Sequence, residues 1–174
     1  MVGGTANYTG FQHVSKEMYE NCVFTGRSTF YAPEAIIKNC TFNQDAYDYH
    51  FWVYGPNSTT KFEGCTFNNL GKAAKVYNES TSESDVFNVE FKDCTFVSSD
   101  NTHDKPAIAV NSLGATYNIT VTNCTTSNYN WNKDDGMAAW YSQRMASATE
   151  AEKLLVGVEG QIDKVTATID GKTY

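Results

Sequence analysis

The chain repeats one short pattern of apolar and polar positions around each of its five cysteines. A large apolar residue stands three positions before each cysteine, and Phe stands two positions after the first four. The position immediately before the cysteine is Asn, Gly or Asp in every repeat. The cysteines are Cys22, Cys40, Cys65, Cys94 and Cys124. Because self-similarity at intervals of roughly 20 to 50 residues is the signature of stacked repeats, the pattern predicts a repeat architecture.

The spacing of these positions predicts the shape of one repeat. Side chains alternate between the two faces of a strand, so the positions five and three before the cysteine share one face, while the cysteine shares a face with the position two after it. The three-residue step between the two sets breaks the alternation and requires a sharp bend, which Asn, Asp or Gly in the left-handed region supplies. Asn21, Asn39 and Asn123 are the corner asparagines. Each repeat is therefore predicted to be a strand, a tight corner and a second strand.

A third strand is predicted after a loop of variable length. Four segments align without gaps and alternate inward with outward positions: 50–55, 72–78, 105–112 and 136–143. Their inward positions would be Phe51, Val53, Ala74, Val76, Ile108, Val110, Ala139 and Tyr141. Their outward positions would be Trp52, Tyr54, Lys75, Tyr77, Ala109, Asn111, Trp140 and Ser142. Three strands per repeat, stacked in parallel, predict a parallel β-helix.

Residues 145–174 depart from the repeat and are predicted to cap it. Ser147 stands three residues before Glu150, which is the spacing of a capping box, so a short helix is expected here. The segment "DKVTATIDGKTY" then predicts a strand with an Asp-Gly turn near its end. A terminal helix or strand commonly covers the unpaired edge of a stacked array.

Two other repeat or β folds fit the pattern less well. Leucine-rich repeats also carry a recurring Asn or Cys, but they need a ladder of Leu, and this chain has only four Leu. An immunoglobulin-like sandwich has short strands, but it would not repeat the same residues in register.

The repeats resemble a known family. Stretches of the form "hxFxNCTFxN", each followed by an apolar strand, resemble the right-handed parallel β-helix repeats of the pectin-lyase-like superfamily. The segments "CTFNQDAYDYHFWVYG", "CTFNNLGKAAKVYN" and "NITVTNCTTSNYNWN" look like β-helix domains of secreted or surface-anchored proteins of gut bacteria, which carry no assigned activity. The resemblance covers roughly residues 11–143 and the closing "KVTATIDGKTY". The stretch 140–151 is longer and more polar than the family pattern.

These observations together give the expected fold. We expect an all-β chain that forms a single-stranded right-handed parallel β-helix of about five coils. Residues 1–144 would form the β-helix, and residues 145–174 would form a C-terminal cap, a short helix and a strand, within the same domain. The resemblance implies that the protein is secreted or lies on a bacterial cell surface.

Charge narrows the classes of partner. The chain carries 13 basic and 20 acidic residues, and its Lys and Arg are scattered. A nucleic-acid binder normally shows a basic patch, so no nucleic-acid partner is expected. No apolar run approaches the length of a membrane span, so no membrane insertion by this segment is expected. No cofactor is expected, and polysaccharide or a protein of the host or cell surface is the expected partner.

The repeated cysteines are interpreted as structural. There is no C-x-x-C motif, and the three His lie far from every Cys in sequence, which argues against a zinc site or a disulfide framework. Neighbouring coils would hold the sulfurs roughly 5 Å apart, too far for a direct S–S bond. We expect the stacked Asn side chains to hydrogen-bond to one another and the stacked Cys to fill narrow interior space.

The outward face of the third strands is the candidate ligand site. Aromatic rings beside polar groups suit the apolar faces of sugar rings. The residues assigned to this candidate glycan-binding face are Trp52, Tyr54, Lys75, Tyr77, Asn111 and Trp140, with His50 and His103 from the preceding loops. Two alternatives remain: neighbouring loops cover these rings, or another part of a longer parent protein packs there.

Catalysis is not expected. A hydrolase needs two carboxylates that face each other across roughly 5–10 Å, and a lyase needs clustered carboxylates for Ca²⁺ plus a basic residue. Asp48 with Asp104, or Asp134 with Asp135, could bind Ca²⁺, but solvated loop carboxylates are far commoner. We expect a module that binds glycan or a protein partner, as an adhesin does. The alternatives are a polysaccharide lyase or glycoside hydrolase, and a structural spacer.

Overall fold

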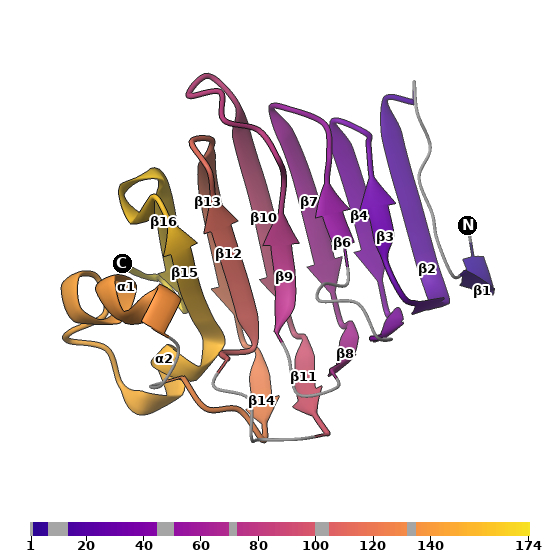
Figure 1. The fold of residues 1–174 in the computed structure, drawn as a ribbon. Coiled ribbons are helices and arrows are strands. Elements are labelled where there is room, and N and C mark those ends of the chain that lie inside the picture. The colour runs from indigo at the N-terminus through magenta and orange to yellow at the C-terminus, as the bar shows by residue number, and fades with distance from the viewer. Residues whose placement is uncertain (1, 7–13, 45–50, 70–72, 100–104, 132–134) are drawn as a thin grey trace.

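The computed structural model describes residues 2–6, 14–44, 51–69, 73–99, 105–131 and 135–174. In these residues the chain is mostly β-strand, and the strands pair in parallel except for the last pair, β16 and β17. They form a twelve-stranded and a five-stranded sheet, with the N-terminal strands at one end and two short α-helices at the other (Figure 1).

Successive repeats contribute strands to the same three rows. The first row is the first half of β2 (Lys16–Thr25), then β4 (Glu34–Lys38), β7 (Ser58–Glu63), β10 (Val86–Lys92), β13 (Thr116–Thr122) and β16 (Val165–Ile169). The second row is β1 (Val2–Ala6), the second half of β2, β5 (Thr41–Asn43), β8 (Thr66–Asn69), β11 (Thr95–Ser98) and β14 (Thr125–Ser127). The third row is β3 (Ser28–Phe30), β6 (Phe51–Val53), β9 (Ala74–Tyr77), β12 (Ile108–Ser112) and β15 (Val156–Gly160). This arrangement is compatible with a parallel β-helix.

The corner between the first and second rows lies at the residue before each cysteine. Asn21, Asn39, Gly64, Asp93 and Asn123 have φ angles of 55°, 50°, 63°, 53° and 50°, in the left-handed region that these residue types tolerate. The side chain of Asn123 donates a hydrogen bond of 2.6 Å to Oδ1 of Asp93 one repeat earlier. A Cβ atom on Gly64 would lie 2.5 Å from Oδ1 of Asn39, so this corner needs Gly for space as well as for φ.

Register pairing stacks like residues in columns inside the molecule. Phe24, Phe42, Phe67 and Phe96 form one column, with centroid distances of 4.7, 4.8 and 4.9 Å and ring planes within 11° of parallel. These distances match the separation of neighbouring strands, roughly 4.8 Å, because one ring comes from each strand. All four rings are fully buried. The column ends where Thr126 replaces Phe.

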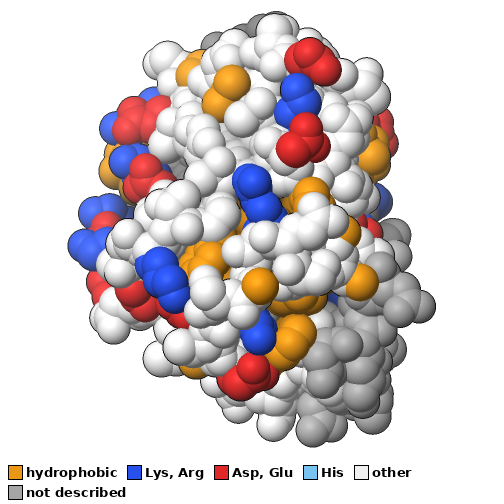
Figure 2. Space-filling model, turned by 90° about the vertical axis from the view of Figure 1, so that its left-hand side faces the viewer, with side chains coloured by type: hydrophobic (Ala, Val, Ile, Leu, Met, Phe, Trp, Pro, Cys, Tyr) orange, Lys and Arg blue, Asp and Glu red, His pale blue; other side chains and the backbone are white. Residues whose placement is uncertain are grey.

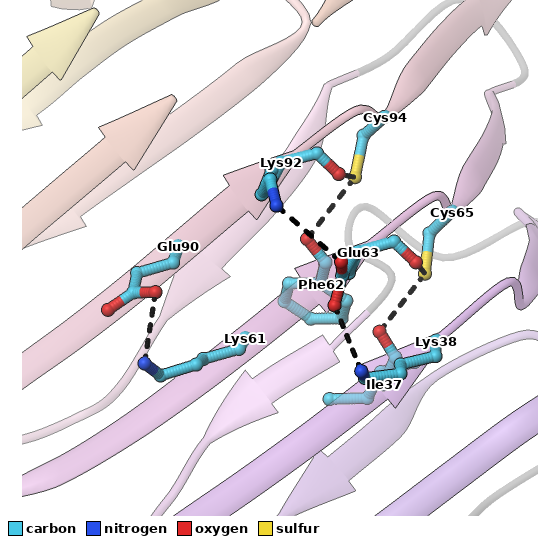
Figure 3. A network of polar contacts seen from close by, with 9 residues as sticks. All are labelled: Ile37, Lys38, Lys61, Phe62, Glu63, Cys65, Glu90, Lys92 and Cys94. Atoms are coloured by element: carbon cyan, nitrogen blue, oxygen red, sulfur yellow. Dashed lines mark hydrogen bonds and ion pairs between the residues drawn. The ribbon is translucent and has the colours of Figure 1, made fainter. Parts of the chain in front are cut away.

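The outer face of the first row carries charges of alternating sign. Nζ of Lys38 and Nζ of Lys92 lie 3.1 and 3.6 Å from the carboxylate of Glu63 between them, and Lys61 lies 3.2 Å from Glu90 (Figure 3). Lys38, and after it Lys92, hold the pKa of the Glu63 carboxyl below its usual value. Exposed pairs add little to stability, but a shifted register would place like charges opposite one another.

The expected strand at 136–143 is wrong. The chain there forms a 3₁₀ turn, η1 (Asp135–Met137), and a helix, α1 (Ala138–Gln143), and β15 takes the place in the third row. The large apolar residues here recur at helical spacing and are buried: Met137, Trp140, Tyr141 and Met145. The strand period of two is found instead in Val156 and Val158. As a consequence, Ala139 is exposed and does not face the interior.

Side chains cover the strand edges at this end. The indole Nε1–H of Trp140 donates 3.1 Å to the carbonyl of Val156 in β15, and Nη2 of Arg144 donates 3.2 Å to the carbonyl of Val165 in β16. Oδ1 of Asp170 accepts the backbone N–H of the corner residue Asn123 at 2.8 Å. Each of these side chains hydrogen-bonds to a backbone group that would otherwise pair with the backbone of a further repeat. Figure 2 shows this end, where hydrophobic side chains are visible only in small separate areas.

A second helix and a final hairpin complete the cap. Helix α2 (Glu150–Leu155) begins with a capping box, but its N-cap is Thr149 rather than Ser147, and its partner is Glu152. The expected strand and turn near the terminus are present: β16 turns at 170–171 and pairs antiparallel with β17 (Lys172–Thr173). A second 3₁₀ turn, η2 (Ile162–Lys164), links β15 to β16.

Replacing Phe67 by Ala tests the aromatic column. Phe67 contacts Phe42 and Phe96 above and below, so the variant should lose about 3–5 kcal/mol of unfolding free energy. Urea denaturation would measure the loss. Thr66→Ala, on the outer side of the same strand, is the control and should stay within about 0.5 kcal/mol of the unmodified chain. Equal effects of the two changes would contradict the stacking.

The capping box predicts an acid-sensitive step. The Thr149 backbone N–H, and after it the Tyr174 hydroxyl, lower the pKa of Glu152 from 4.5 to about 2. Because the folded-state pKa is depressed, this stabilisation is complete above the unfolded pKa and is lost as pH falls from about 4.5 to about 2. The midpoint of thermal unfolding should therefore fall less over this range in Glu152→Gln than in the unmodified chain. An equal fall of the unfolding midpoint with pH in both proteins would contradict the contact between the Glu152 carboxylate and the Thr149 N–H.

Candidate functional site

The outer face of the third row is built from alternate residues of five strands. Inward residues of these strands, such as Phe51, Val76 and Val110, are fully buried. The outward positions, from the N-terminal to the C-terminal end, are Thr29, Tyr31, Trp52, Tyr54, Lys75, Tyr77, Ala109, Asn111, Gly157 and Glu159. The face is therefore aromatic over its first three repeats and lined by small or polar residues over the last two.

Four of these aromatic side chains contact one another, and we call them the aromatic shelf: Tyr31, Trp52, Tyr54 and Tyr77. The ring centroids of Trp52 and Tyr77 are 5.6 Å apart, those of Trp52 and Tyr54 are 6.2 Å apart, and those of Tyr31 and Tyr54 are 4.8 Å apart. Tyr54 is 49% exposed, and the other three are half-buried. The packing holds each ring against a neighbour, so a ligand would meet a surface with little side-chain freedom left to lose.

Tyr31 is a member of the shelf that sequence reasoning missed. The sequence alignment of third strands started at residue 50, so the strand of the first repeat, β3, was not recognised. The pairing of Thr29 with Trp52 and of Phe30 with Val53 places Tyr31 opposite Tyr54. The alternation in "STFYA" is the signal that could have found it.

Charged groups border the shelf on its C-terminal side. Nζ of Lys75 lies 5.5 Å from the ring centroid of Tyr77. Lys105 forms an ion pair of 3.3 Å with Glu159, which stands beside Asn111 in register. Glu159 was missed because the strand that carries it was assigned to residues 136–143. The outer face of the third row therefore carries a carboxylate, which the outward positions expected from the sequence did not include.

Helix α1 limits the face at its C-terminal end. A Cβ atom built on Gly157 would lie 2.7 Å from the hydroxyl of Tyr141 and would collide with Sδ of Met137. The neighbouring Ala109 is only 3% exposed. The small residues of β12 and β15 therefore make room for η1 and α1, and the shelf ends at Tyr77.

Trp140 is not part of the candidate face. It is fully buried, and its indole nitrogen bonds to β15, so its role is to hold α1 against the sheet. Ser142, also expected on the face, is exposed on α1. His50, His103, Asp48, Asp104 and Asp134 lie outside the described residues.

Another aromatic cluster belongs to the cap. Nε1 of Trp131 donates 2.9 Å to Glu150, and Nζ of Lys153 lies 4.6 Å from the centroid of the Trp131 ring. The Trp131 ring also meets Tyr141, at 4.8 Å between ring centroids. These contacts tie the start of α2 to α1 and to the end of the second row.

Titratable groups offer no ordinary metal centre in the part of the chain that is described. No group of three or more His, Cys, Asp or Glu there could hold a metal ion. The neighbouring Cys40 thiol raises the pKa of Cys65 to about 12, and burial adds to the effect.

No helix among the described residues is long and apolar enough to cross a membrane.

Comparisons with protein families, with curated proteins and with solved structures find no match to this chain.

Replacing Trp140 by Phe tests its structural assignment. The change leaves the buried carbonyl of Val156 without its donor, so unfolding free energy should fall by about 1–3 kcal/mol. Chemical denaturation followed by circular dichroism would measure this. Tyr54→Phe, which removes a hydroxyl from the exposed shelf, is the control and should be nearly neutral. If only Tyr54→Phe lost stability, the structural role assigned to Trp140 would be wrong.

Proposed function

We propose that this protein is an extracellular or cell-surface module that binds glycan, or else a protein partner, through the aromatic shelf. Its fold would be a right-handed parallel β-helix of about five coils, of the pectin-lyase-like kind, from a secreted or surface-anchored bacterial protein. The cysteine-centred repeats and the three rows of parallel strands support this assignment. The single observation that carries the function is the contact of four aromatic side chains from three consecutive repeats on one outer face.

A glycan is favoured over a protein by the chemistry of the shelf. Tyr and Trp present flat apolar surfaces with a polar group at one end, which matches the apolar face and hydroxyl rim of a sugar ring. Lys75, Asn111 and Glu159 stand at the C-terminal border and offer donors and acceptors for sugar hydroxyls. The shelf also crosses several strands, so an extended chain could contact successive rings.

The outer face of the first row differs from the shelf. Its charged side chains pair with one another from strand to strand, and the apolar Met18 stands near the N-terminal end, 55% exposed. Met18 supplies a large exposed side chain on a different face of the same molecule. This makes it a matched control for the shelf.

A glycan array tests the proposal with three variants. Trp52→Ala and Tyr54→Ala should each weaken binding to any glycan that the unmodified chain recognises, by about tenfold or more, because aromatic stacking contributes about 0.5–1.5 kcal/mol beyond the area it buries. Met18→Ala should bind as the unmodified chain does. Dissociation constants for the best glycan would be measured by calorimetry.

One result would contradict the proposal, and a second would decide between its two ligands. Binding that survives both shelf substitutions would place the ligand elsewhere on the molecule. Binding of a cell-surface protein but of no glycan, lost in Tyr54→Ala, would keep the shelf as the site and replace glycan by protein as its ligand.

A further inference from the structure

The five cysteines form a column along the interior of the second row. The second-row strands pair in register, with Val23, Thr41, Thr66, Thr95 and Thr125 in one line, so the cysteine before each of them also lies opposite the next. All five are free thiols. We call Cys22, Cys40, Cys65, Cys94 and Cys124 the thiol column.

The thiol groups point in the same direction along the column. Sγ of Cys65 lies 3.5 Å from the carbonyl of Ile37, and Sγ of Cys94 lies 3.5 Å from the carbonyl of Phe62, the equivalent atom one repeat later (Figure 3). Sγ of Cys124 accepts the backbone N–H of Cys94 at 3.4 Å. Each sulfur is therefore held in the same place relative to the corner of its repeat.

The spacing of the column matches one kind of metal coordination. Parallel strands are roughly 4.8 Å apart, and residues opposite one another repeat at that distance. A metal–sulfur bond is roughly 2.3 Å long, so one ion held in a straight line between two sulfurs places them about 4.6 Å apart. Soft ions such as Cu(I) select thiolate ligands, and a linear pair satisfies them, whereas Zn²⁺ requires four ligands in a tetrahedron.

We propose that the thiol column binds soft monovalent metal ions, Cu(I) or Ag(I), each held between two successive cysteines, with the first ion between Cys94 and Cys124. Because the strand spacing matches the length of a linear S–metal–S unit, the strands do not have to move for this coordination. In the binding step two S–H bonds break, two metal–sulfur bonds form and two protons pass to solvent, with no change of oxidation state. The complex carries one negative charge. The hydrogen bond that the backbone N–H of Cys94 donates to Sγ of Cys124 helps to stabilise this charge.

The solvent exposure of the thiols indicates that the first ion binds between Cys94 and Cys124. Cys124 is half-buried, whereas each of the other four thiols is at most 2% exposed. At the opposite end, β1 pairs with the second half of β2, with Gly4 opposite Cys22. An ion therefore reaches the column at Cys124 before the remaining thiols.

Titration of the reduced protein with Ag(I) under anaerobic conditions tests the proposal. The folded chain should bind a first ion and release two protons, measured by calorimetry and by proton release into weak buffer. Cys124→Ala should weaken this first step at least a hundredfold. Cys22→Ala makes the same chemical change at the far end of the column and should leave it unaltered. Cu(I) held in a competing chelator should give the same order of variants, and Zn²⁺ should not bind.

Each other outcome overturns the proposal. No uptake of Ag(I) by the folded chain would show that the column serves packing alone. Equal binding by Cys124→Ala and Cys22→Ala would place the ion elsewhere. Loss of the β-sheet circular dichroism signal during titration would show that the metal binds the unfolded chain, and uptake of Zn²⁺ at similar concentrations would exclude linear coordination. Urea midpoints of both variants, measured first without metal, establish that they are folded.

Discussion

In-register parallel pairing of successive repeats is the constraint on which the rest of the structure depends. Because each strand lies beside its counterpart from the next repeat, a residue type kept at one position becomes a column. The corner residues, the thiols and the Phe rings are three such columns, and the paired charges outside form a fourth. A slip of one residue would turn the inward side chains outward and move the left-handed corners onto residues that do not tolerate them.

The same pairing explains why the interior varies less than the outer face of the third row. Interior columns are buried and mostly apolar, so their residues vary less in polarity from strand to strand than residues outside. The outer face of the third row varies from aromatic rings to Ala and Gly along its length. Variation allows the rings of Trp52, Tyr54 and Tyr77 to gather at one end and helix α1 to pack at the other.

Sequence reasoning predicted the parts that repeat and failed where the repeat ends. The corners and the inward Phe, Val and Ile positions follow from a break in a two-residue period, which is visible in five copies. The last third-row strand was misplaced because "MAAW" contains apolar residues that fit a strand alignment, while Met137, Trp140, Tyr141 and Met145 fit a helix better. That error moved Trp140 onto the candidate face and left Glu159 unrecognised.

Tyr31 was missed for the opposite reason: its strand is short and lies before the first clear alignment. The helix after residue 145 was expected, but its N-cap was assigned to Ser147 instead of Thr149, since both fit the spacing of a capping box to an acidic residue.

The coupling energy between neighbouring Phe residues tests the in-register stacking most directly. A double-mutant cycle on Phe67 and Phe96, each replaced by Ala and measured by urea denaturation, isolates the interaction of two rings 4.9 Å apart. The structure predicts a coupling of about 0.5–1.5 kcal/mol for this pair. It predicts additive effects, within about 0.5 kcal/mol, for Phe24 and Phe96, which two other rings separate. Additivity in the neighbouring pair would contradict the stacking and with it the placement of the aromatic shelf and the thiol column.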